Sequence, residues 1–138
     1  MKPLFDHLKQ TALTIEGVKQ VELLYEESDM ETFPDRLYTF IGVQFGETTI
    51  NNSGQVVDRI NFVFEQAYFE ESAYVDVMDR LLQQIRELKF LLTKTNDRWS
   101  FASEWNLTQF KYMSIDLSCG YVCSVDVIDN RAWNSCKV

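Results

Sequence analysis

The residues whose side chains could do acid–base or nucleophilic chemistry are few, and the sequence does not bring them together. The one histidine, His7, lies in a stretch with helical spacing and has no acidic partner fixed beside it. A nucleophilic serine or cysteine needs a positioned base, and nothing in the spacing places His7 next to Cys119. We therefore expect His7 to be an ordinary surface or edge residue, and we expect neither a catalytic site nor an enzyme.

The three cysteines do not follow a disulfide or metal-binding pattern. Cys119 and Cys123 belong to an alternating stretch, so a regular strand would hold them on one face, about 13 Å apart. That separation exceeds the reach of a disulfide and of a shared zinc ion. We expect both thiols to be buried as small apolar groups, with Cys136 in a polar tail and no metal or other cofactor.

Three aromatic residues, Trp99, Phe101 and Trp105, alternate and could form a platform on which single-stranded bases stack. No Lys or Arg is interleaved with them, so packing in a core explains them better. The chain has 13 Lys and Arg against 21 Asp and Glu, a net charge of -8. A negative domain lacks the charge that supplies non-specific nucleic-acid affinity. Nucleic-acid binding is therefore not expected as its main activity, although an acidic surface would let DNA pass without capture.

The net negative charge comes entirely from the first half of the chain. Residues 1–71 contain 5 basic and 13 acidic side chains, whereas residues 72–138 contain 8 of each. Five of the acids fall within residues 26–36, a segment with a proline and no periodicity, which we interpret as an exposed loop. Loops of this length are often functional in compact domains, although a charge run can also be simply a solvated face.

The length of 138 residues fits one domain, and the apolar periodicity predicts the order α-β-β-β-α-β-β. A mostly antiparallel sheet of about five strands packed on two helices would form an α+β fold. No window is apolar enough for a membrane span, and the start lacks a signal peptide, so we expect a soluble intracellular protein with no membrane partner. The expected elements are a helix over 3–14, strands over 18–25, 37–45 and 56–66, a helix over 73–92, strands over 99–105 and 112–127, and a C-terminal tail over 129–138.

Four stretches carry a likeness to a known family: the opening helix running into residues 18–23, the strand 38–45 after a Pro-containing loop, the long helix 74–92, and the closing strand 113–128. Together they resemble the tail terminator, or tail completion, proteins of long-tailed bacteriophages and prophages of the lambda-like and Mu-like kinds. The resemblance covers residues 5–129 and depends on element order, length and hydrophobic pattern.

The resemblance implies a structural virion protein. Its subunits would form a six-membered ring that caps the tail tube, ends tail polymerisation and joins the tail to the head-side neck. Its partners would be further copies of itself, the tail-tube protein and neck or connector proteins, with DNA passing through the lumen without specific binding. Its location would be the tail or neck of the virion, after assembly in the bacterial host cytoplasm.

A ring requires two different, complementary patches on each subunit. The acidic first half and the charge-balanced second half of the chain offer such a pair. We expect the acidic loop to face basic side chains on the long helix of a neighbouring subunit, with Phe33 either anchoring the loop or presenting an apolar contact. The candidate interface residues are Glu26, Glu27, Asp29, Glu31, Phe33, Arg80, Arg86 and Lys89.

Three alternatives remain open from the sequence. The chain could be another head–tail connector or neck protein. It could instead be a small-ligand-binding α+β domain whose pocket is lined by the face with Trp99 and Trp105. An acidic protein that mimics DNA is the third possibility, but its acids should spread over a whole face, whereas here they cluster in loops.

Overall fold

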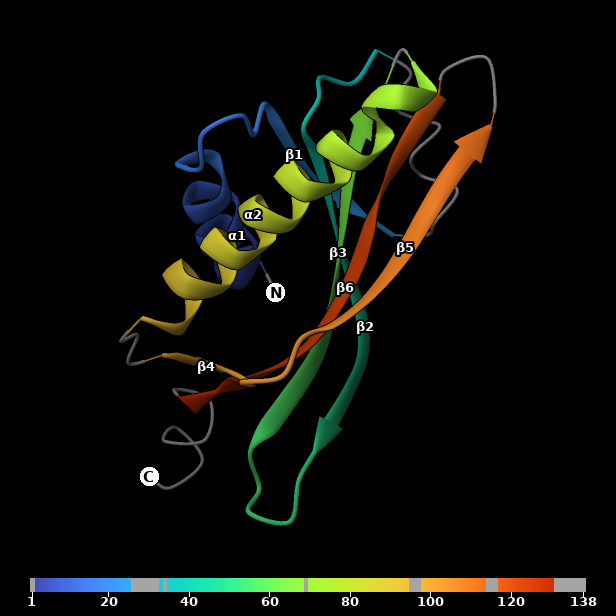
Figure 1. Cartoon of the computed structure of the whole chain (residues 1–138). Coiled ribbons are helices and arrows are strands. Elements are labelled where there is room, and N and C mark those ends of the chain that lie inside the picture. Colours follow the sequence, from blue (N-terminus) through green and yellow to red (C-terminus); the bar gives the residue numbers. More distant parts are fainter. Residues whose placement is uncertain are drawn as a thin grey trace.

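The computed structural model describes residues 2–25, 33, 35–68, 70–94, 98–113 and 117–130. They form two α-helices and a six-stranded, mostly antiparallel sheet, which is the expected α+β class (Figure 1). The elements are α1 (Lys2–Leu13), β1 (Gln20–Leu24), β2 (Phe40–Ile50), β3 (Val56–Ala67), the 3-10 turn η2 (Glu71–Ala73), α2 (Tyr74–Thr93), β4 (Trp99–Phe101), β5 (Asn106–Met113) and β6 (Leu117–Asp129).

The sheet is built around a central antiparallel pair, β3 and β6. On one side β2 pairs antiparallel with β3, and the short strand β1 pairs parallel with the first part of β2. On the other side both β4 and β5 pair antiparallel with β6, at opposite ends of that long strand. The two sides of the sheet therefore end in different strands.

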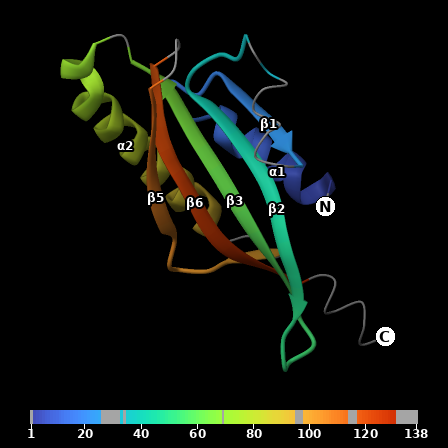
Figure 2. The ribbon, with the colours of Figure 1, turned by 90° about the vertical axis from the view of Figure 1, so that its right-hand side faces the viewer.

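Both helices lie on the same face of the sheet, and Figure 2 shows the strands in front of them. The helices bury stripes with 3/4 spacing, which is the pattern of an amphipathic helix. They pack against alternating apolar residues of the central strands, which point to one face because the strand period is two. The core stripes are Leu4, Leu8 and Ala12 on α1, Val77, Leu81, Ile85, Leu88 and Leu92 on α2, Ile60, Phe62 and Phe64 on β3, and Cys119, Tyr121, Cys123, Val125 and Val127 on β6.

The sheet has one strand more than the sequence pattern predicts. The strand expected over 99–105 ends at Phe101, and β5 occupies residues 106–113, where no full strand was expected. The last strand was predicted to run from 112 to 127 without a break, whereas residues 112 and 113 belong to β5 and β6 begins at Leu117. β5 escaped detection because it pairs on one side only and most of its side chains are exposed, so it lacks a buried apolar alternation.

Gly120 is required by the close approach of three strands. It lies in β6 opposite Glu65 of β3 and Phe110 of β5. A Cβ atom at this position would lie 1.7 Å from the carbonyl oxygen of Phe64 and 2.7 Å from the ring of Phe110. Only glycine fits there, and its presence in the middle of a long strand marks this contact.

The β2–β3 hairpin extends beyond the part of the sheet that the helices cover (Figure 1). We call residues 45–58, which form its outer end, the arm. A bulge between Phe45 and Thr48 bends β2 at the start of the arm. The turn is held by Asn51, whose amide oxygen accepts from the backbone N–H groups of Ser53 and Gln55, each at 3.0 Å. The arm is therefore a preformed projection.

Candidate assembly surfaces

The acidic half of the predicted interface, Glu26, Glu27, Asp29 and Glu31, lies outside the described residues. The structure does describe Phe33, whose ring packs against Phe40 at the start of β2, with the ring centroids 5.8 Å apart. Phe33 is half-buried there, so it anchors its segment to the face of the sheet that the helices leave open. As an apolar contact for a neighbour it stays a prediction.

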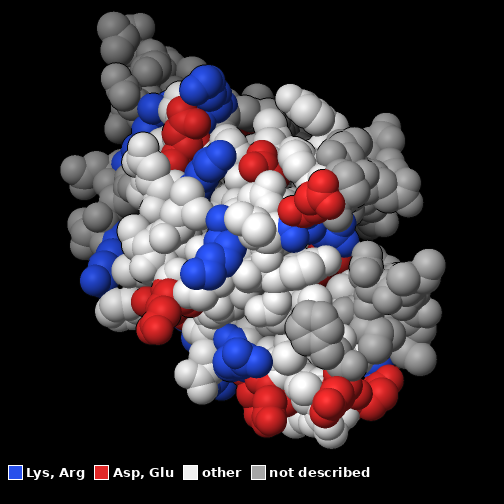
Figure 3. Space-filling model, turned by 90° about the horizontal axis from the view of Figure 1, so that it is seen from above, with Lys and Arg blue, Asp and Glu red and all other residues white. Residues whose placement is uncertain are grey.

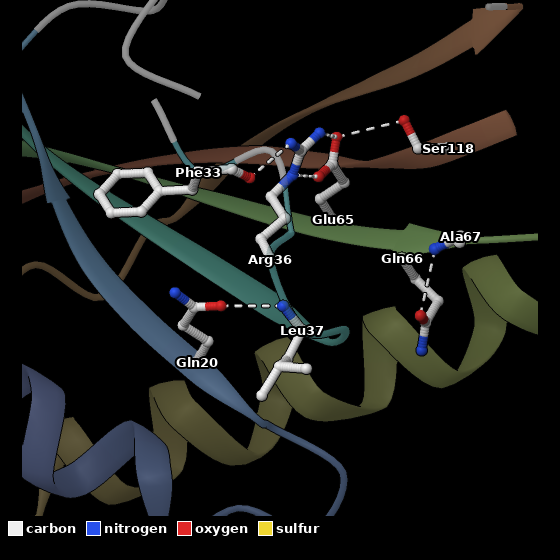
Figure 4. Close-up of polar contacts among 8 residues, drawn as sticks. All are labelled: Gln20, Phe33, Arg36, Leu37, Glu65, Gln66, Ala67 and Ser118. Atoms are coloured by element: carbon white, nitrogen blue, oxygen red, sulfur yellow. Dashed lines mark hydrogen bonds and ion pairs between the residues drawn. The ribbon is translucent and has the colours of Figure 1, made fainter. Parts of the chain in front are cut away.

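A buried ion pair anchors the end of the same segment. Arg36 donates through Nε and Nη2 to the two carboxylate oxygens of Glu65, and through Nη1 to the carbonyl oxygen of Phe33 (Figure 4). Ser118 on β6 donates a further hydrogen bond of 3.2 Å to Oε2 of Glu65. The Glu65 side chain is 0% exposed. A buried carboxylate is costly unless it is paired and hydrogen-bonded, and this one has three donors.

Sequence reasoning missed this pair because the two residues are far apart in the chain. Glu65 falls on the polar side of the β3 alternation, which ordinarily faces water. In the structure that position is covered by the segment before β2, and Arg36 comes from this cover. The only sign of a buried ion pair in the sequence was an acidic residue within a strand rich in aromatic side chains, and this pattern is not specific.

A second set of hydrogen bonds joins the segment before β2 to α2 and to β1. The hydroxyl of Thr39, which is buried, donates to Oε1 of Gln84 on α2 at 3.0 Å. The amide nitrogen of Gln84 donates to the backbone oxygen of Glu16 at 3.1 Å. The backbone N–H of Leu37 donates to Oε1 of Gln20 at 2.8 Å (Figure 4). The segment just before β2 is thus fixed both to the helix layer and to the sheet.

The basic half of the predicted interface lies on α2 but does not form one patch. Arg86 and Lys89 are three residues apart, so they lie on neighbouring positions of the helix surface. Arg80 is about 120° around the helix from Arg86, at 100° per residue. Arg80 lines a hollow of about 400 Å³ whose rim also includes Glu16 and Glu87.

Charges of both signs are mixed on the face of the molecule that Figure 3 shows. Lys and Arg side chains lie between Asp and Glu side chains, and neither sign covers the visible described surface. A broad field of one sign, as a DNA mimic would need, is not seen on this part of the described surface.

The arm carries an exposed apolar side chain at its end. Ile50 is 71% exposed and is followed directly by the turn that Asn51 organises. The arm is stiffened by the hydroxyl of Thr48, which donates to Asp58 at 2.6 Å. Just inside the arm, the ion pair of Arg59 with Asp126 at 3.1 Å joins β3 to β6. The hydrogen bond to Asp126 raises the pKa of the Arg59 guanidinium.

An apolar hollow lies where β1 ends beside β2. Its volume is about 640 Å³, and it is lined by Lys2, Phe5, Asp6, Leu23, Leu24, Tyr25 and Phe45. β1 pairs with β2 only from Phe40 to Gln44, so the hollow lies at the first residue of β2 that has no β1 partner. Tyr25, at its rim, is 80% exposed.

The aromatic residues that could have lined a nucleic-acid platform or a ligand pocket are engaged within the fold. Trp105 is buried and stacks on Phe62, with the ring centroids 5.6 Å apart. Trp99 stacks on His7 of α1 at 5.1 Å. His7 is therefore a packing contact between α1 and β4, and its partial burial lowers the pKa of the imidazole.

The two cysteines of β6 behave as the spacing predicts. Cys119 and Cys123 are fully buried free thiols in the core. Burial raises the pKa of Cys119 to about 11 and that of Cys123 to about 12. Both are therefore protonated near neutral pH, which is the unreactive form. Cys136 lies outside the described residues.

Lys111 links β5 to the start of α2. Its ammonium group donates to Glu71 at 2.8 Å and lies 4.5 Å from the ring centroid of Tyr74 and 5.6 Å from that of Tyr68. The hydrogen bond to Glu71 raises the pKa of this ammonium group. The contact fixes the edge strand β5 to η2 and α2.

In the described part of the chain, no three His, Cys, Asp or Glu residues are grouped as a metal site would require. No described helix has both the length and the apolar content needed to cross a membrane. No protein-family model matches the sequence, and no curated protein matches it significantly.

Proposed function

We propose that the chain is a structural ring subunit of a bacteriophage tail, a tail terminator that caps the tail tube, ends its polymerisation and joins it to the neck. The support from sequence is the order and pattern of the elements. The support from geometry is one feature above all, the preformed arm with Ile50 exposed at its end. The ring, the tail-tube protein and the neck proteins are partners under this proposal, and the virion is its location.

The arm supports an assembly role because it contributes little to its own subunit. It projects beyond both helices (Figure 1). Its side chains from Glu47 to Ser53 are exposed. Four side-chain hydrogen bonds with Asn51 or Asp58 nevertheless hold it in shape. A rigid projection loses little conformational freedom on binding, so it is suited to contact another subunit or the tube.

A ring also needs unlike surfaces on the two sides of each subunit. The sheet meets this requirement, since one side ends in β1 and β2 and the other in β4 and β5. The charge-based seam, between residues 26–31 of one copy and Arg86 and Lys89 of the next, remains part of the proposal.

Light scattering over a concentration series, with negative-stain images of the same sample, tests the ring. We expect six-membered rings, either of the protein alone or on the ends of added tail-tube protein. Changing Glu26, Glu27, Asp29 and Glu31 together to lysine should weaken assembly while leaving the circular dichroism spectrum unchanged. A protein that stays monomeric in both settings would contradict the proposal, and unaltered assembly of the lysine variant would contradict the charge-based seam.

A neck or connector protein of the same virion is a close variant of this proposal, and binding to a purified portal or head-completion protein instead of the tube would favour it.

A second candidate of another class is a small-ligand-binding domain. The hollow beside Phe5 and Phe45 favours it, because its volume of about 640 Å³ is in the usual range for ligand sites. A thermal-shift screen of small apolar compounds tests it. A stabilising hit that Phe45→Glu abolishes would support this candidate over the assembly proposal.

A further inference from the structure

The outer edge of β2 is unpaired along the arm. β1 covers β2 only from Phe40 to Gln44, whereas β2 continues to Ile50. No other described strand pairs with residues 45–50 on that side. The backbone N–H and C=O groups there form a six-residue template for a further strand.

The opposite side of the sheet has a matching edge. β5 pairs with β6 along its whole length from Asn106 to Met113, and no described strand pairs with its other side. The free segment of β2 carries one charge, Glu47, and β5 carries one of opposite sign, Lys111. Neither edge contains proline or the several charges that commonly protect free edges, and the bulge between Phe45 and Thr48 is the one such device.

The directions of these two strands fit a rotational assembly. β2 is antiparallel to β3, β3 to β6, and β6 to β5, so β2 and β5 run in opposite directions within one subunit. A rotation about a ring axis that is inclined to the strands keeps every strand at the same tilt and in the same sense. The inclination also supplies the shift along the strands that this pairing needs, because β5 begins level with Gln44 within one subunit. The edge of β5 from the next copy would therefore approach β2 antiparallel. In this arrangement the hydrogen bonds run perpendicular to the strands, and the pairing is slightly more stable than a parallel one.

We propose that residues 45–50 of β2 pair with the outer edge of β5 of a second copy, so that the sheet continues across the seam between subunits. This inference rests on the proposed ring, since a contact between two unlike edges closes only by rotation. The main-chain hydrogen bonds would supply affinity. The apolar hollow at Phe45 lies at the inner end of this edge, where a side chain of the incoming strand can enter it.

Cross-linking between two differently labelled chains tests the pairing. Thr49 and Thr108 are exposed and lie on the face that the helices leave open, whereas Gln109 is exposed on the other face of β5. In a Cys136→Ser background, one chain carries Thr49→Cys, and its mixing partner carries Thr108→Cys or Asn106→Cys. Paired strands bring opposite residues within disulfide reach. We expect a disulfide-linked dimer with at least one of these partners on a non-reducing gel, and none with Gln109→Cys or with Thr49→Cys alone.

The outcomes separate this inference from the proposed function. Rings without any cross-link in either mixture would overturn the edge pairing and leave the ring intact. Cross-linked dimers in a sample that forms no ring would support the edge pairing and overturn the ring. Absence of both rings and cross-links, with and without tail-tube protein, would overturn both.

Discussion

Arg36 donates two hydrogen bonds to the carboxylate of Glu65, which is fully buried on the face of the sheet that the helices do not cover. The pair joins the segment before β2 to the central strand β3, and Ser118 joins it to β6. A single ion pair thus connects the described residues just before β2 to the middle of the sheet.

Removing the arginine should destabilise the protein strongly. Arg36→Ala would leave the buried carboxylate of Glu65 without its counter-charge, which typically costs about 3–5 kcal/mol. Urea unfolding monitored by tryptophan fluorescence measures the change. The matched control is Lys2→Ala, which removes an exposed pair with Asp6 at 3.0 Å and should cost about 0.5 kcal/mol or less. Equal effects of the two substitutions would contradict the role of the buried pair.

A methyl group at Gly120 should disrupt the centre of the sheet. Gly120→Ala places a Cβ atom 1.7 Å from the carbonyl oxygen of Phe64, and a paired backbone atom cannot move aside cheaply. We expect a loss of about 3 kcal/mol or more, at the upper end of overpacking effects. Gly46→Ala is the control, because its Cβ atom would meet the Arg59 carbonyl oxygen at an ordinary 3.4 Å. A Gly120→Ala melting temperature equal to that of Gly46→Ala would refute the argument.

The buried thiols should resist labelling and should make the fold sensitive to alkali. Cys119 and Cys123 have pKa values of about 11 and about 12, raised by burial from 9.0. In Cys136→Ser protein at pH 8, a thiol reagent should label neither residue in the native state and both in urea. As the pH rises, the thiols of the unfolded chain ionise before the buried thiols of the folded chain. The stabilisation of the folded state by the buried, protonated thiols is therefore complete below about pH 9 and falls as the pH rises towards 12. Replacing Cys123 by alanine should reduce the loss of unfolding free energy between pH 9 and 11. Fast labelling of either cysteine in the native protein would contradict their burial.

His7 should give the protein a modest sensitivity to acid. Burial against Trp99 lowers the pKa of His7 below its ordinary 6.5, so the unfolded chain takes up the proton first as the pH falls. The stability from the neutral ring is complete above pH 6.5 and is lost below it. His7→Phe keeps an aromatic ring and should lose less unfolding free energy than the original chain between pH 7 and 5. Parallel losses in the two proteins would show that His7 does not contribute.

Ile50 should matter for assembly and not for folding. Its side chain is 71% exposed at the end of the arm, so Ile50→Asp should leave the melting temperature of the isolated subunit unchanged. If the arm contacts a partner, the same substitution should weaken ring formation, because a desolvated charge would enter the contact. Analytical ultracentrifugation of the two proteins at equal concentrations provides the comparison. Gln10→Glu, which also adds a negative charge but at an exposed position of α1, serves as the control.

The periodic elements could be predicted from the sequence, but the contacts between them could not. The 3/4 spacing predicts α2 to within one residue at each end, and the alternation predicts β6 from residue 117 onwards, because buried faces impose a period on the sequence. β5 was missed because an edge strand with exposed side chains imposes none. The Arg36–Glu65 pair was missed for a related reason, since a partner brought by tertiary structure leaves no local pattern.

The candidate interface was predictable only as a contrast of charge between two regions. The spacing of Arg86 and Lys89 on one helix is local and could be inferred, but Arg80 lies on another side of the same helix. The last β1–β2 pair is Leu24 with Gln44, so β2 is unpaired on this side beyond Gln44. The sequence of β2 alone does not show where β1 ends, so this free edge could not be predicted.

The central position of the β3–β6 pair has a consequence during synthesis on the ribosome. β3 emerges before α2, and β6 emerges after β5. The edge of β3 that pairs with β6 therefore stays unpaired until almost the whole chain has been synthesised. During that interval the apolar stripe of Ile60, Phe62 and Phe64 is without the strand that completes its layer. Such late, non-local pairing slows folding and exposes nascent chains to aggregation. Slower translation after residue 67 would prolong this vulnerable state, so the yield of native protein in the cell should depend on how quickly the second half of the chain is made.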